Sequence, residues 1–518
     1  MTVSVILIVA FAVLARVMTA WLRLEPWLDE AMLMTNLPFA HGAGLLAPLP
    51  FYDQASPVGY LLLAHLMAGW APGHETLALR VLSALFSITG LVCLLGLLRT
   101  VRLQRLAPGV IVLACLSPFA VHYGVEIKHY QAEFVFTALL LWAGARLRLV
   151  PSARTGLQFF GASVFAMIFS FTAPLVIASV SVATVLGRLR AIRPRLLVVL
   201  SACSLSSVFA VGWYLGVTRP ISRAQFAAND LLYATGYLQL PPTSALQAKA
   251  WFRLPRFLGE MLLPRYSSDW GSIVGAIVAL LLGLGLWRLV RSSTFLVWCF
   301  IVLFGLLYIL SFAHALPHFS ARHFFFIIPL AAVVFAAGLE ALLIVACWRR
   351  TGLVTPLFAA LSVMLGTLSL VQIANARLPE LRPTIAYYER NGQRDPLWVF
   401  AGAEPSIEIL APGLPRINRS RRDSMITTSQ EEWQRQMATG MWDLDALRRG
   451  ENVVSEHYKS SFRDDLRQHR SVWLLFSSIS QQNLDMMIKV ATETDLSCES
   501  VFHAGGALLM HCVRQKPS

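Results

Sequence analysis

The sequence predicts a polytopic α-helical membrane protein with a small α/β domain at its C-terminal end. Of the 518 residues, 56% are hydrophobic and 14% are charged, whereas about 25% are charged in an average soluble domain. Long apolar runs separated by short arginine clusters extend to residue 375 and are typical of membrane spans. The remainder is more polar and its charges balance, which indicates a soluble extension. We therefore expect two domains, 1–375 and 376–518.

About eleven apolar runs in the first domain are predicted to cross the membrane. The first has no basic segment before it and no small-residue cleavage site after it, so we expect an uncleaved anchor rather than a signal peptide. The runs are Val3–Ala20, Leu77–Leu98, Ala107–Val121, Phe134–Ala145, Leu157–Ser170, Ala173–Leu186, Leu196–Gly216, Ser272–Trp287, Thr294–Phe312, Phe324–Trp348 and Leu353–Ile373.

The placement of arginine predicts the orientation of the chain, because Lys and Arg concentrate in cytoplasmic loops. Alternate connections carry arginines and no acidic residue: Arg99, Arg102, Arg105, Arg146, Arg148, Arg154, Arg188, Arg190, Arg193, Arg195, Arg288, Arg291, Arg349 and Arg350. They equal the net charge of +14, so the basic character reports topology, and we predict no nucleic-acid partner. We expect the loops 21–76 and 217–271 and the C-terminal domain outside the cytoplasm, in a multi-pass protein of the cell (inner) membrane.

Two adjacent carboxylates, Asp29 and Glu30, follow the first span closely. Apolar neighbours such as Trp27 place them at the membrane interface, where partial burial raises the pKa of a carboxyl toward that of a useful general base. The same pair also suits the first turn of a helix over 31–37, because carboxylates there favour the helix dipole. Residue chemistry leaves both interpretations open.

A second segment, Phe51–Tyr60, combines aromatic rings with Asp53 and Gln54 just before an apolar helix. Aromatic rings stack on the apolar face of a sugar, and carboxylate and amide groups bind its hydroxyls. The segment is therefore a candidate sugar or acceptor site that includes Tyr60. An aromatic belt at the membrane interface is the alternative.

The turn His122–Glu133 holds more ionisable groups than a connection between two spans requires. Lys128 is one of two lysines in the first domain, and a compact ammonium beside the membrane holds a lipid phosphate as a point charge. Glu126, His129 and Tyr130 are candidates to bind sugar or acceptor. The alternative is a snorkelling lysine paired with a neighbouring carboxylate.

Three further side chains are candidates to hold a phosphate through charge-assisted hydrogen bonds. Arg322 and His318 lie in the segment before the tenth span, and Arg80 lies one turn into the second. An arginine at that depth is either an interfacial snorkeller or the partner of an outer carboxylate. The histidine spacing around His318 matches no metal-ligand pattern, so we predict no metal site.

The C-terminal domain shows strand runs at 397–400, 472–476, 499–503 and 507–513, the last two around a Gly-Gly hairpin signal. Helical patterns lie near 431–447 and 481–492, and no catalytic constellation is visible. Cys498 and Cys512 lie nearly opposite on the hairpin, where a disulfide and free thiols are equally open. In the loop 217–271, basic and aromatic residues alternate, which suggests amphipathic helices on the membrane.

The order of these clusters resembles the type C glycosyltransferases, and within them family 39, which includes protein O-mannosyltransferases and aminoarabinose transferases of lipid A. The resemblance covers roughly residues 1–375. The matching segments are Asp29-Glu30, Tyr52-Asp53-Gln54 with Pro57 and Gly59-Tyr60, Ala78–Ser83, Ser117-Pro118, Glu126–Tyr130, and His318 to Arg322 with Pro329.

The resemblance implies inverting transfer of a sugar from a polyprenyl-phosphate donor in the membrane to an extracytoplasmic acceptor of the cell envelope, which is a lipid, glycan or protein. It implies that Asp29 is the general base, supported by Glu30. Because the leaving group is a phosphate anion, it implies that Lys128, Arg322 and Arg80 stabilise it. No cofactor is implied, and the need for a divalent metal stays open because it varies within the superfamily.

Two departures from the family pattern bear on the substrates. The aminoarabinose transferases carry Glu-Lys where this chain has Asp53-Gln54, so we expect a different donor sugar or acceptor. The luminal β-trefoil of the eukaryotic mannosyltransferases has no counterpart, which weakens the case for a protein acceptor.

Two other function classes remain. The first is a transporter or flippase of lipid-linked sugars, which would place ionisable groups near the membrane midplane. Here the acidic residues collect at one interface and only Glu340 lies deep in a span. The second is a non-catalytic subunit of an envelope-assembly complex.

Overall fold

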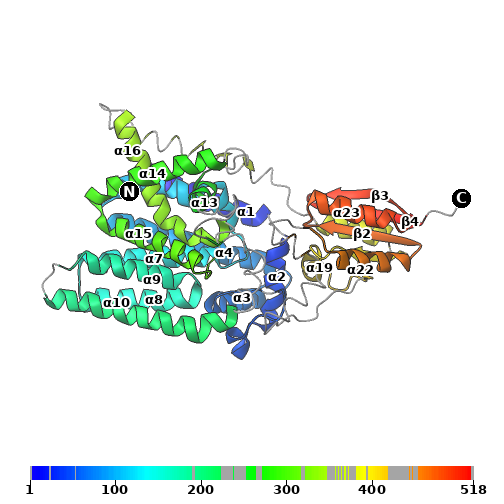
Figure 1. Cartoon of the computed structure of the whole chain (residues 1–518), viewed down its shortest axis with the longest axis horizontal. Coiled ribbons are helices and arrows are strands. Elements are labelled where there is room, and N and C mark those ends of the chain that lie inside the picture. The colour runs from blue at the N-terminus through cyan, green and yellow to red at the C-terminus, as the bar shows by residue number, and fades with distance from the viewer. Residues whose placement is uncertain are drawn as a thin grey trace. The chain divides into compact units, whose positions relative to one another are not determined.

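The chain divides into two compact units in the computed structural model shown in Figure 1. The helical unit comprises Met1–Leu22, Ser56–Pro220 and Gly236–Asn375, and the loop–tail unit comprises Arg23–Ala55, Ile221–Thr235 and Ala376–Ser518. Of the predicted first loop 21–76, residues 23–55 thus group with the C-terminal domain, and residues from Ser56 on belong to the helical unit. The structure describes residues 3–22, 25–52, 54–189, 193–222, 237–238, 253–263, 271–316, 321–346, 381–392, 395–417 and 453–514, with isolated residues between 356 and 446.

Apolar helices long enough to cross a membrane make the chain a polytopic membrane protein, as the sequence predicts. Within the described residues there are six: Val5–Leu22, Glu75–Thr100, Pro194–Ser222, Ile273–Ser292, Thr294–Phe312 and Ala321–Ile344. Four shorter apolar helices accompany them: Val58–Trp70, Gln104–Leu116, Ala153–Phe169 and Ala173–Leu186. The predicted count of eleven spans is not confirmed, and most of the predicted span 353–373 lies outside the described residues.

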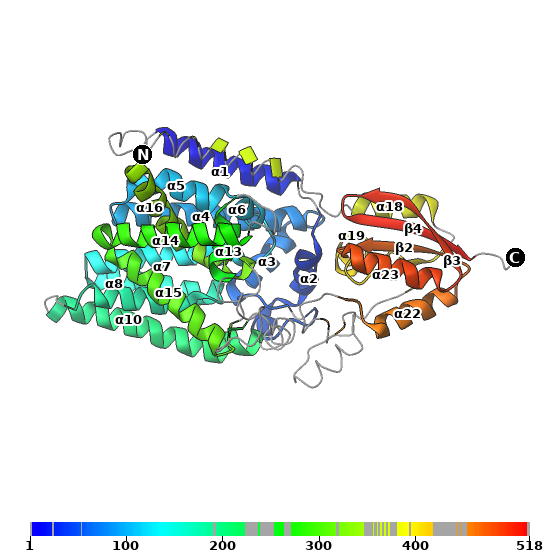
Figure 2. The same ribbon diagram turned by 45° about the horizontal axis from the view of Figure 1, so that its top comes forward.

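The helices of this unit run side by side as a bundle (Figures 1 and 2). They are α1 (Val3–Leu22), α3 (Val58–Trp70), α4 (Glu75–Thr100), α5 (Ala107–Ile111), α6 (Pro118–Tyr123), α7 (Tyr130–Leu149), α8 (Ala153–Phe169), α9 (Ala173–Leu186), α10 (Arg193–Trp213), α13 (Arg253–Leu262), α14 (Gly271–Ser292), α15 (Thr294–Phe312) and α16 (Ile328–Ala346). Short turns of other helix types are η3 (Gln104–Leu106), η4 (Val112–Leu116), η5 (Tyr214–Thr218) and η8 (Ala321–Ile327).

The third predicted span is broken at Ser117, which is extended with ψ 147° between the π-helical η4 and α6. Pro118 causes the break, because its ring disfavours helical geometry in the preceding residue. The Ser117 hydroxyl accepts the Ala120 N–H at 3.1 Å and donates to the Met261 carbonyl at 2.6 Å. The break therefore anchors α13, an amphipathic helix in the loop where the sequence predicts one.

The loop–tail unit contains a four-stranded mixed sheet with the order β1-β2-β4-β3. Figure 2 labels three of these strands, β2, β3 and β4. The strands are β1 (Leu397–Val399), β2 (Ser471–Ser477), β3 (Leu496–Ala504) and β4 (Ala507–Arg514); β1 is parallel to β2 and the other pairs are antiparallel. Four helices accompany the sheet: α18 (Leu381–Asn391), α19 (Glu404–Leu410), α22 (Glu456–Arg467) and α23 (Gln481–Thr492).

Strand β2 is buried on both faces, as its continuous apolar run predicts. Val472 and Leu474 pack with side chains of α22 and α23, whereas Trp473 and Leu475 pack with side chains of α18 and α19. The domain is therefore α/β with helices on both faces of the sheet. The predicted helix near 431–447 lies almost wholly outside the described residues.

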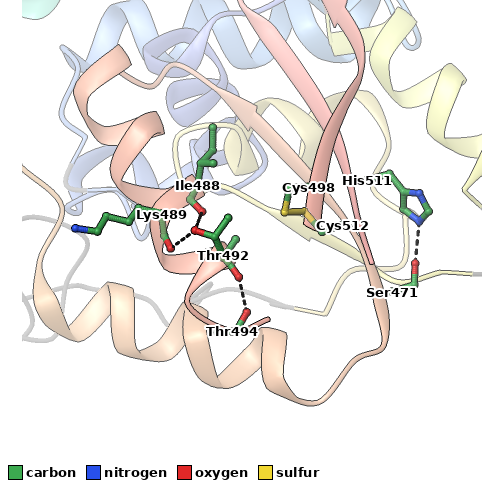
Figure 3. Close-up of a disulfide and its surroundings, with 9 residues drawn as sticks. Ser471, Ile488, Lys489, Thr492, Thr494, Cys498, His511 and Cys512 are labelled. Atoms are coloured by element: carbon green, nitrogen blue, oxygen red, sulfur yellow. Dashed lines mark hydrogen bonds between the residues drawn. A yellow bond between two sulfur atoms is a disulfide. The ribbon is translucent and has the colours of Figure 1, made fainter. Parts of the chain in front are cut away.

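The predicted hairpin turns at Gly505, whose φ of +54° suits glycine. Cys498 and Cys512 are directly opposite in the register of β3 and β4 and are joined by a disulfide (Figure 3). The cysteines Cys93, Cys115, Cys203 and Cys299 are free and buried in the helical unit, where they serve as apolar packing residues.

Candidate active site

One face of α4 holds the ionisable turn between α6 and α7. Arg80, Ser83 and Ser87 are spaced three and four residues apart, which places them on one side of the helix. Arg80 Nη1 donates to the Val125 carbonyl at 3.2 Å, and the Ser83 hydroxyl donates to the Glu126 carbonyl at 2.7 Å. The backbone of the turn 124–129 is therefore held against α4 through the carbonyls of Val125 and Glu126.

The third member of this face, Ser87, accepts a hydrogen bond from Arg16 Nε in α1. Arg16 is 3% exposed, and its Nη1 donates to the carbonyls of Ala12 and Cys115 at 2.9 Å each. Among the described residues no carboxylate pairs with Arg16. A β-carbon at Gly124 would lie 3.3 Å from Arg16 Nε, so this cation lies directly beside the turn.

Sequence reasoning missed Arg16, although the signal was present. An arginine well inside an apolar span is costly and is a functional hypothesis by default. Arg16 stands in the predicted first span and is followed there only by apolar residues and one threonine. Its partners come from α4 and from η4, which no local pattern links to α1.

The turn buries its charged side chains. Glu126 is 1% exposed, Lys128 6% and Glu133, in the first turn of α7, 2%. The Lys128 N–H donates to the Glu126 carbonyl at 2.8 Å. This degree of burial does not fit a lysine that snorkels into water.

His129 lies in an aromatic pocket beside Lys128. Its Nδ1 is 3.3 Å from the hydroxyl oxygen of Ser56, and its ring meets those of Tyr60 and Phe171 edge-on, with centroids 6.3 and 5.3 Å apart. Burial lowers the pKa of His129 to about 3, and the Lys128 ammonium contributes to the shift. His129 is therefore neutral at physiological pH.

The segment with Arg322 approaches the same turn. In η8, His323 meets Tyr130 edge-on at 6.3 Å and Phe325 stacks on Phe119 of α6 at 5.9 Å. Arg322 directly precedes His323 and is half-buried. The structure thus brings η8 to the turn that carries Lys128, while His318 lies outside the described residues.

Glu340, the carboxylate within the tenth predicted span, forms ion pairs with two arginines. Its oxygens lie 2.9 Å from Arg105 Nε and 3.4 Å from Arg288 Nε. Both arginines belong to the basic connections that are predicted to be cytoplasmic. Glu340 therefore joins α16 to η3 and α14 by ion pairs.

In the loop–tail unit, Asp29 and Glu30 lie in the first turn of α2 (Leu28–Asn36). Glu30 is 1% exposed, and its carboxylate accepts the Trp27 N–H at 3.1 Å. Asp29 is half-buried. The helix-start interpretation therefore fits both carboxylates, of which Glu30 bonds the Trp27 N–H and Asp29 is the more accessible.

The segment after α2 folds back onto it. The Asn36 side chain donates to the Phe51 carbonyl and accepts the Phe51 N–H, both at 3.0 Å. Gln54 Nε2 donates to the Tyr52 carbonyl at 3.2 Å, and Tyr52 adopts a φ of +62°, which is rare for a bulky residue. Asp53 lies outside the described residues.

The C-terminal domain holds this whole segment. The Glu25 carboxylate accepts the N–H groups of Leu381 and Arg382, which begin α18, at 2.6 and 3.2 Å. The Ser406 hydroxyl in α19 donates to the Pro26 carbonyl at 3.2 Å, and the Tyr52 hydroxyl donates to Glu408 at 3.4 Å. The segment that carries Asp29 is therefore held by α18 and α19 of the C-terminal domain.

A serine, a histidine and an aspartate also meet in this domain. The Ser471 hydroxyl lies 2.8 Å from His511 Nε2 and 2.8 Å from Asp395 Oδ2 (Figure 3 shows the first contact). Asp395 lies 3.1 Å from the same histidine nitrogen. A hydrolase triad uses opposite nitrogens of the imidazole for serine and aspartate, so this cluster is structural.

The sequence-predicted residues thus form two groups. Arg80, Glu126, Lys128, His129 and Tyr130 meet at one turn of the helical unit, where Tyr60 and the Arg322 segment join them. Asp29, Glu30 and Gln54 lie together in the loop–tail unit. Within the described residues no cluster of His, Cys, Asp and Glu has the arrangement of a metal site.

No protein-family model matches the sequence, and no curated protein matches it. Among solved structures, ArnT from Cupriavidus metallidurans in the apo state is similar, with 13% identity and a TM-score of 0.53 over 98% of this chain and 97% of that chain. The same protein bound to undecaprenyl phosphate matches over the same shares, with 14% identity and a TM-score of 0.48. The apo oligosaccharyltransferase of Archaeoglobus fulgidus matches with 13% identity and a TM-score of 0.45, over 80% of this chain and 64% of that chain.

Proposed function

We propose that this chain, which has the type C glycosyltransferase fold seen in apo ArnT, transfers a sugar from a polyprenyl-phosphate donor to an extracytoplasmic acceptor of the cell envelope. The observation that carries the proposal is the turn 124–129, where Arg80 and Lys128 are 2% and 6% exposed and Arg16 lies alongside. The three cations outnumber the buried carboxylates of Glu126 and Glu133 at this turn, and an excess of buried positive charge favours an anionic ligand.

The cations suit the leaving group of this reaction. When the bond between the anomeric carbon and the phosphate oxygen breaks, negative charge develops on that oxygen. Lys128, Arg80 and Arg322 supply positive charge to stabilise it, and a buried site strengthens each interaction. Neutral His129 contributes packing and a hydrogen bond rather than charge, with Tyr60 and Tyr130 as neighbours for the sugar ring.

Asp29 is the proposed general base. It takes the proton of the acceptor hydroxyl as the oxygen attacks the anomeric carbon, and attack from the side opposite the phosphate inverts the configuration. Glu30 is committed to the helix start through the Trp27 N–H, so it positions Asp29 rather than sharing its task. Gln54 and Glu126 are proposed to bind hydroxyl groups.

An extracytoplasmic C-terminal domain is supported by its cysteines. Cys498 and Cys512 form a disulfide, and disulfides persist in oxidising compartments. The arginine-rich connections support the same orientation from the other end of the spans. A transporter is less supported, because the deep carboxylate Glu340 is engaged by two arginines.

A reconstituted transfer assay tests the proposal. The purified chain in liposomes would receive undecaprenyl-phosphate sugars with a radioactive label and a bacterial envelope extract. We expect transfer by the wild type and a loss of about 10²–10⁴-fold in Asp29→Asn, as for removal of a general base. Asp464→Asn is the matched control, because Asp464 is exposed on α22.

Two results would contradict the proposal. Absence of transfer by the wild type across the panel of donors would remove the enzyme assignment. Full activity of Asp29→Asn, with transfer intact in the wild type, would remove only the assignment of the base.

A further inference from the structure

A pair of arginines at one end of the helical unit has no role in the proposed reaction. Arg148 lies in the last turn of α7 and Arg188 follows α9, and both side chains are half-buried. The Arg188 side chain donates to the carbonyls of Arg148 and Leu149, the second at 2.9 Å. These bonds fix one guanidinium beside the helix end that carries the other.

Arg148 is itself held from three sides. Its Nη2 donates to Thr294 Oγ1 at 2.7 Å, and its guanidinium carbon lies 5.8 Å from the centroid of the Phe295 ring. A β-carbon at Gly187 would overlap the guanidinium, so the absence of a side chain there admits it. The charge is thus fixed where α7, α9 and α15 meet.

In the part of the chain that the structure describes, no negative charge pairs with these arginines. The carbonyls near Arg188 carry only partial charges. The first turn of α15 also has no acidic residue, and the Ser293 side chain does not cap it. Unsatisfied N–H groups at a helix start attract anions. The two arginines, the lack of a paired carboxylate among the described residues and the start of α15 therefore all favour a negatively charged ligand.

Exposed apolar side chains adjoin the pair. Leu149 and Val150 at the end of α7 are 53% and 63% exposed, and Leu186 and Leu189 around the end of α9 are 38% and 58% exposed. A free phosphate ion gains nothing from such neighbours, whereas a phospholipid presents a phosphate and acyl chains together.

We propose that Arg148, Arg188 and the first turn of α15 bind the phosphate of an anionic membrane phospholipid, whose acyl chains cover the neighbouring leucines. The site is separate from the turn that carries Lys128 and involves neither donor nor acceptor. It links the ends of three helices through one lipid headgroup, and so the lipid stabilises the bundle.

Lipid titration of the full purified chain tests this proposal without a transfer assay. Phosphatidylglycerol would be added to protein in detergent with phosphatidylcholine, and bound lipid and melting temperature would be measured by native mass spectrometry and thermal unfolding. We expect saturable binding that raises the melting temperature. Arg148→Gln should weaken it about tenfold, the value of one charged hydrogen bond.

Two further variants make the result specific. Gly187→Ala keeps both charges but displaces the Arg148 guanidinium, so it should also weaken binding, and it decides the question if Arg148→Gln does not fold. Arg291→Gln removes an arginine that stacks on Trp287 at 4.9 Å, and it should leave binding unchanged.

Three outcomes would overturn the proposal. Equal losses in Arg148→Gln and Arg291→Gln would show diffuse attraction rather than a site. Equal binding of phosphatidylcholine would remove the requirement for an anionic headgroup. The same stabilisation by millimolar inorganic phosphate alone would show a site for the free anion.

Discussion

Arg16 shows how one side chain organises the candidate donor site. Its three hydrogen bonds reach Ala12 in its own helix, Ser87 in α4 and Cys115 in the π-helical η4. Cys115 lies in the last turn of η4, where carbonyls have no partner within the helix, and Arg16 bonds one of them. It therefore acts as a positioning residue for the turn that carries Lys128.

Replacement of Arg16 by methionine should destabilise the chain and weaken donor use. The Cys115 carbonyl loses its side-chain donor, at a cost of about 1–3 kcal/mol, and the adjoining turn loses its support. Thermal unfolding in detergent and the KM for the donor would measure both effects. Arg16→Lys should restore part of the stability, whereas Arg291→Met should match the wild type; an unchanged KM in Arg16→Met would contradict the positioning role.

His129 predicts a pH dependence of stability. Its pKa is about 3 in the folded chain against 6.5 for the free side chain, so between these values the unfolded state binds more protons. Stability should therefore fall as the pH is lowered, by about 2 kcal/mol from pH 7 to pH 5 for this group. Melting temperatures of the wild type and His129→Gln would measure it, and an equal acid sensitivity of the two proteins would refute the assignment.

At the scale of elements, the start of α18 depends on a residue from the far end of the sequence. The Glu25 carboxylate accepts both leading N–H groups of this helix, as an N-terminal cap does. The helix packs against Trp473 in the sheet. A substitution at Glu25 should therefore affect the sheet, because α18 packs against it. It should also affect the position of the candidate base Asp29, which follows Glu25 closely in the sequence.

Glu25→Gln should destabilise the start of α18 and the segment that carries Asp29. Loss of the charge at the cap should cost about 1 kcal/mol and increase hydrogen exchange at the amides of Leu381 and Arg382, and transfer activity should fall with it. Glu389→Gln, at an exposed position of the same helix, is the control and should change neither. Unaltered exchange at Leu381 in Glu25→Gln would rule out the cap.

Local patterns predicted some elements and missed others for physical reasons. The bounds of α9 and α23 were predicted to the residue, because apolar periodicity and end signals are local. The break at Ser117 depends on a single proline inside an apolar run, and the start of α18 is bonded by Glu25, which lies 356 residues away in the sequence. The grouping at the turn followed partly from motif order, but the roles of Ser83, Ser87 and Arg16 depend on long-range contacts.

At the scale of the whole molecule, orientation decides which chemistry is available. The arginine-rich connections and the Cys498–Cys512 disulfide favour opposite sides of the membrane. The disulfide closes a loop whose ends lie 14 residues apart in the sequence, and such a loop is worth about 3 kcal/mol in the chain-entropy account.

Labelling of cysteine variants with a membrane-impermeant maleimide should show the orientation. In intact spheroplasts, Asp464→Cys on the exposed side of α22 should react, whereas Arg291→Cys should react only after lysis, because it lies in a predicted cytoplasmic connection. The reverse pattern would place the C-terminal domain in the cytoplasm and remove the extracytoplasmic acceptor from the proposal.

The contact between Glu25 and α18 can form only late in the synthesis of the chain. The ribosome makes Glu25 356 residues before Leu381, which at about 5–20 residues per second is a delay of roughly 20–70 s. During that interval the segment with Asp29 has emerged without the helix and sheet that hold it. The segment with the candidate base thus gains its contacts with α18 and α19 only late in synthesis, and a chain interrupted before residue 381 would lack them.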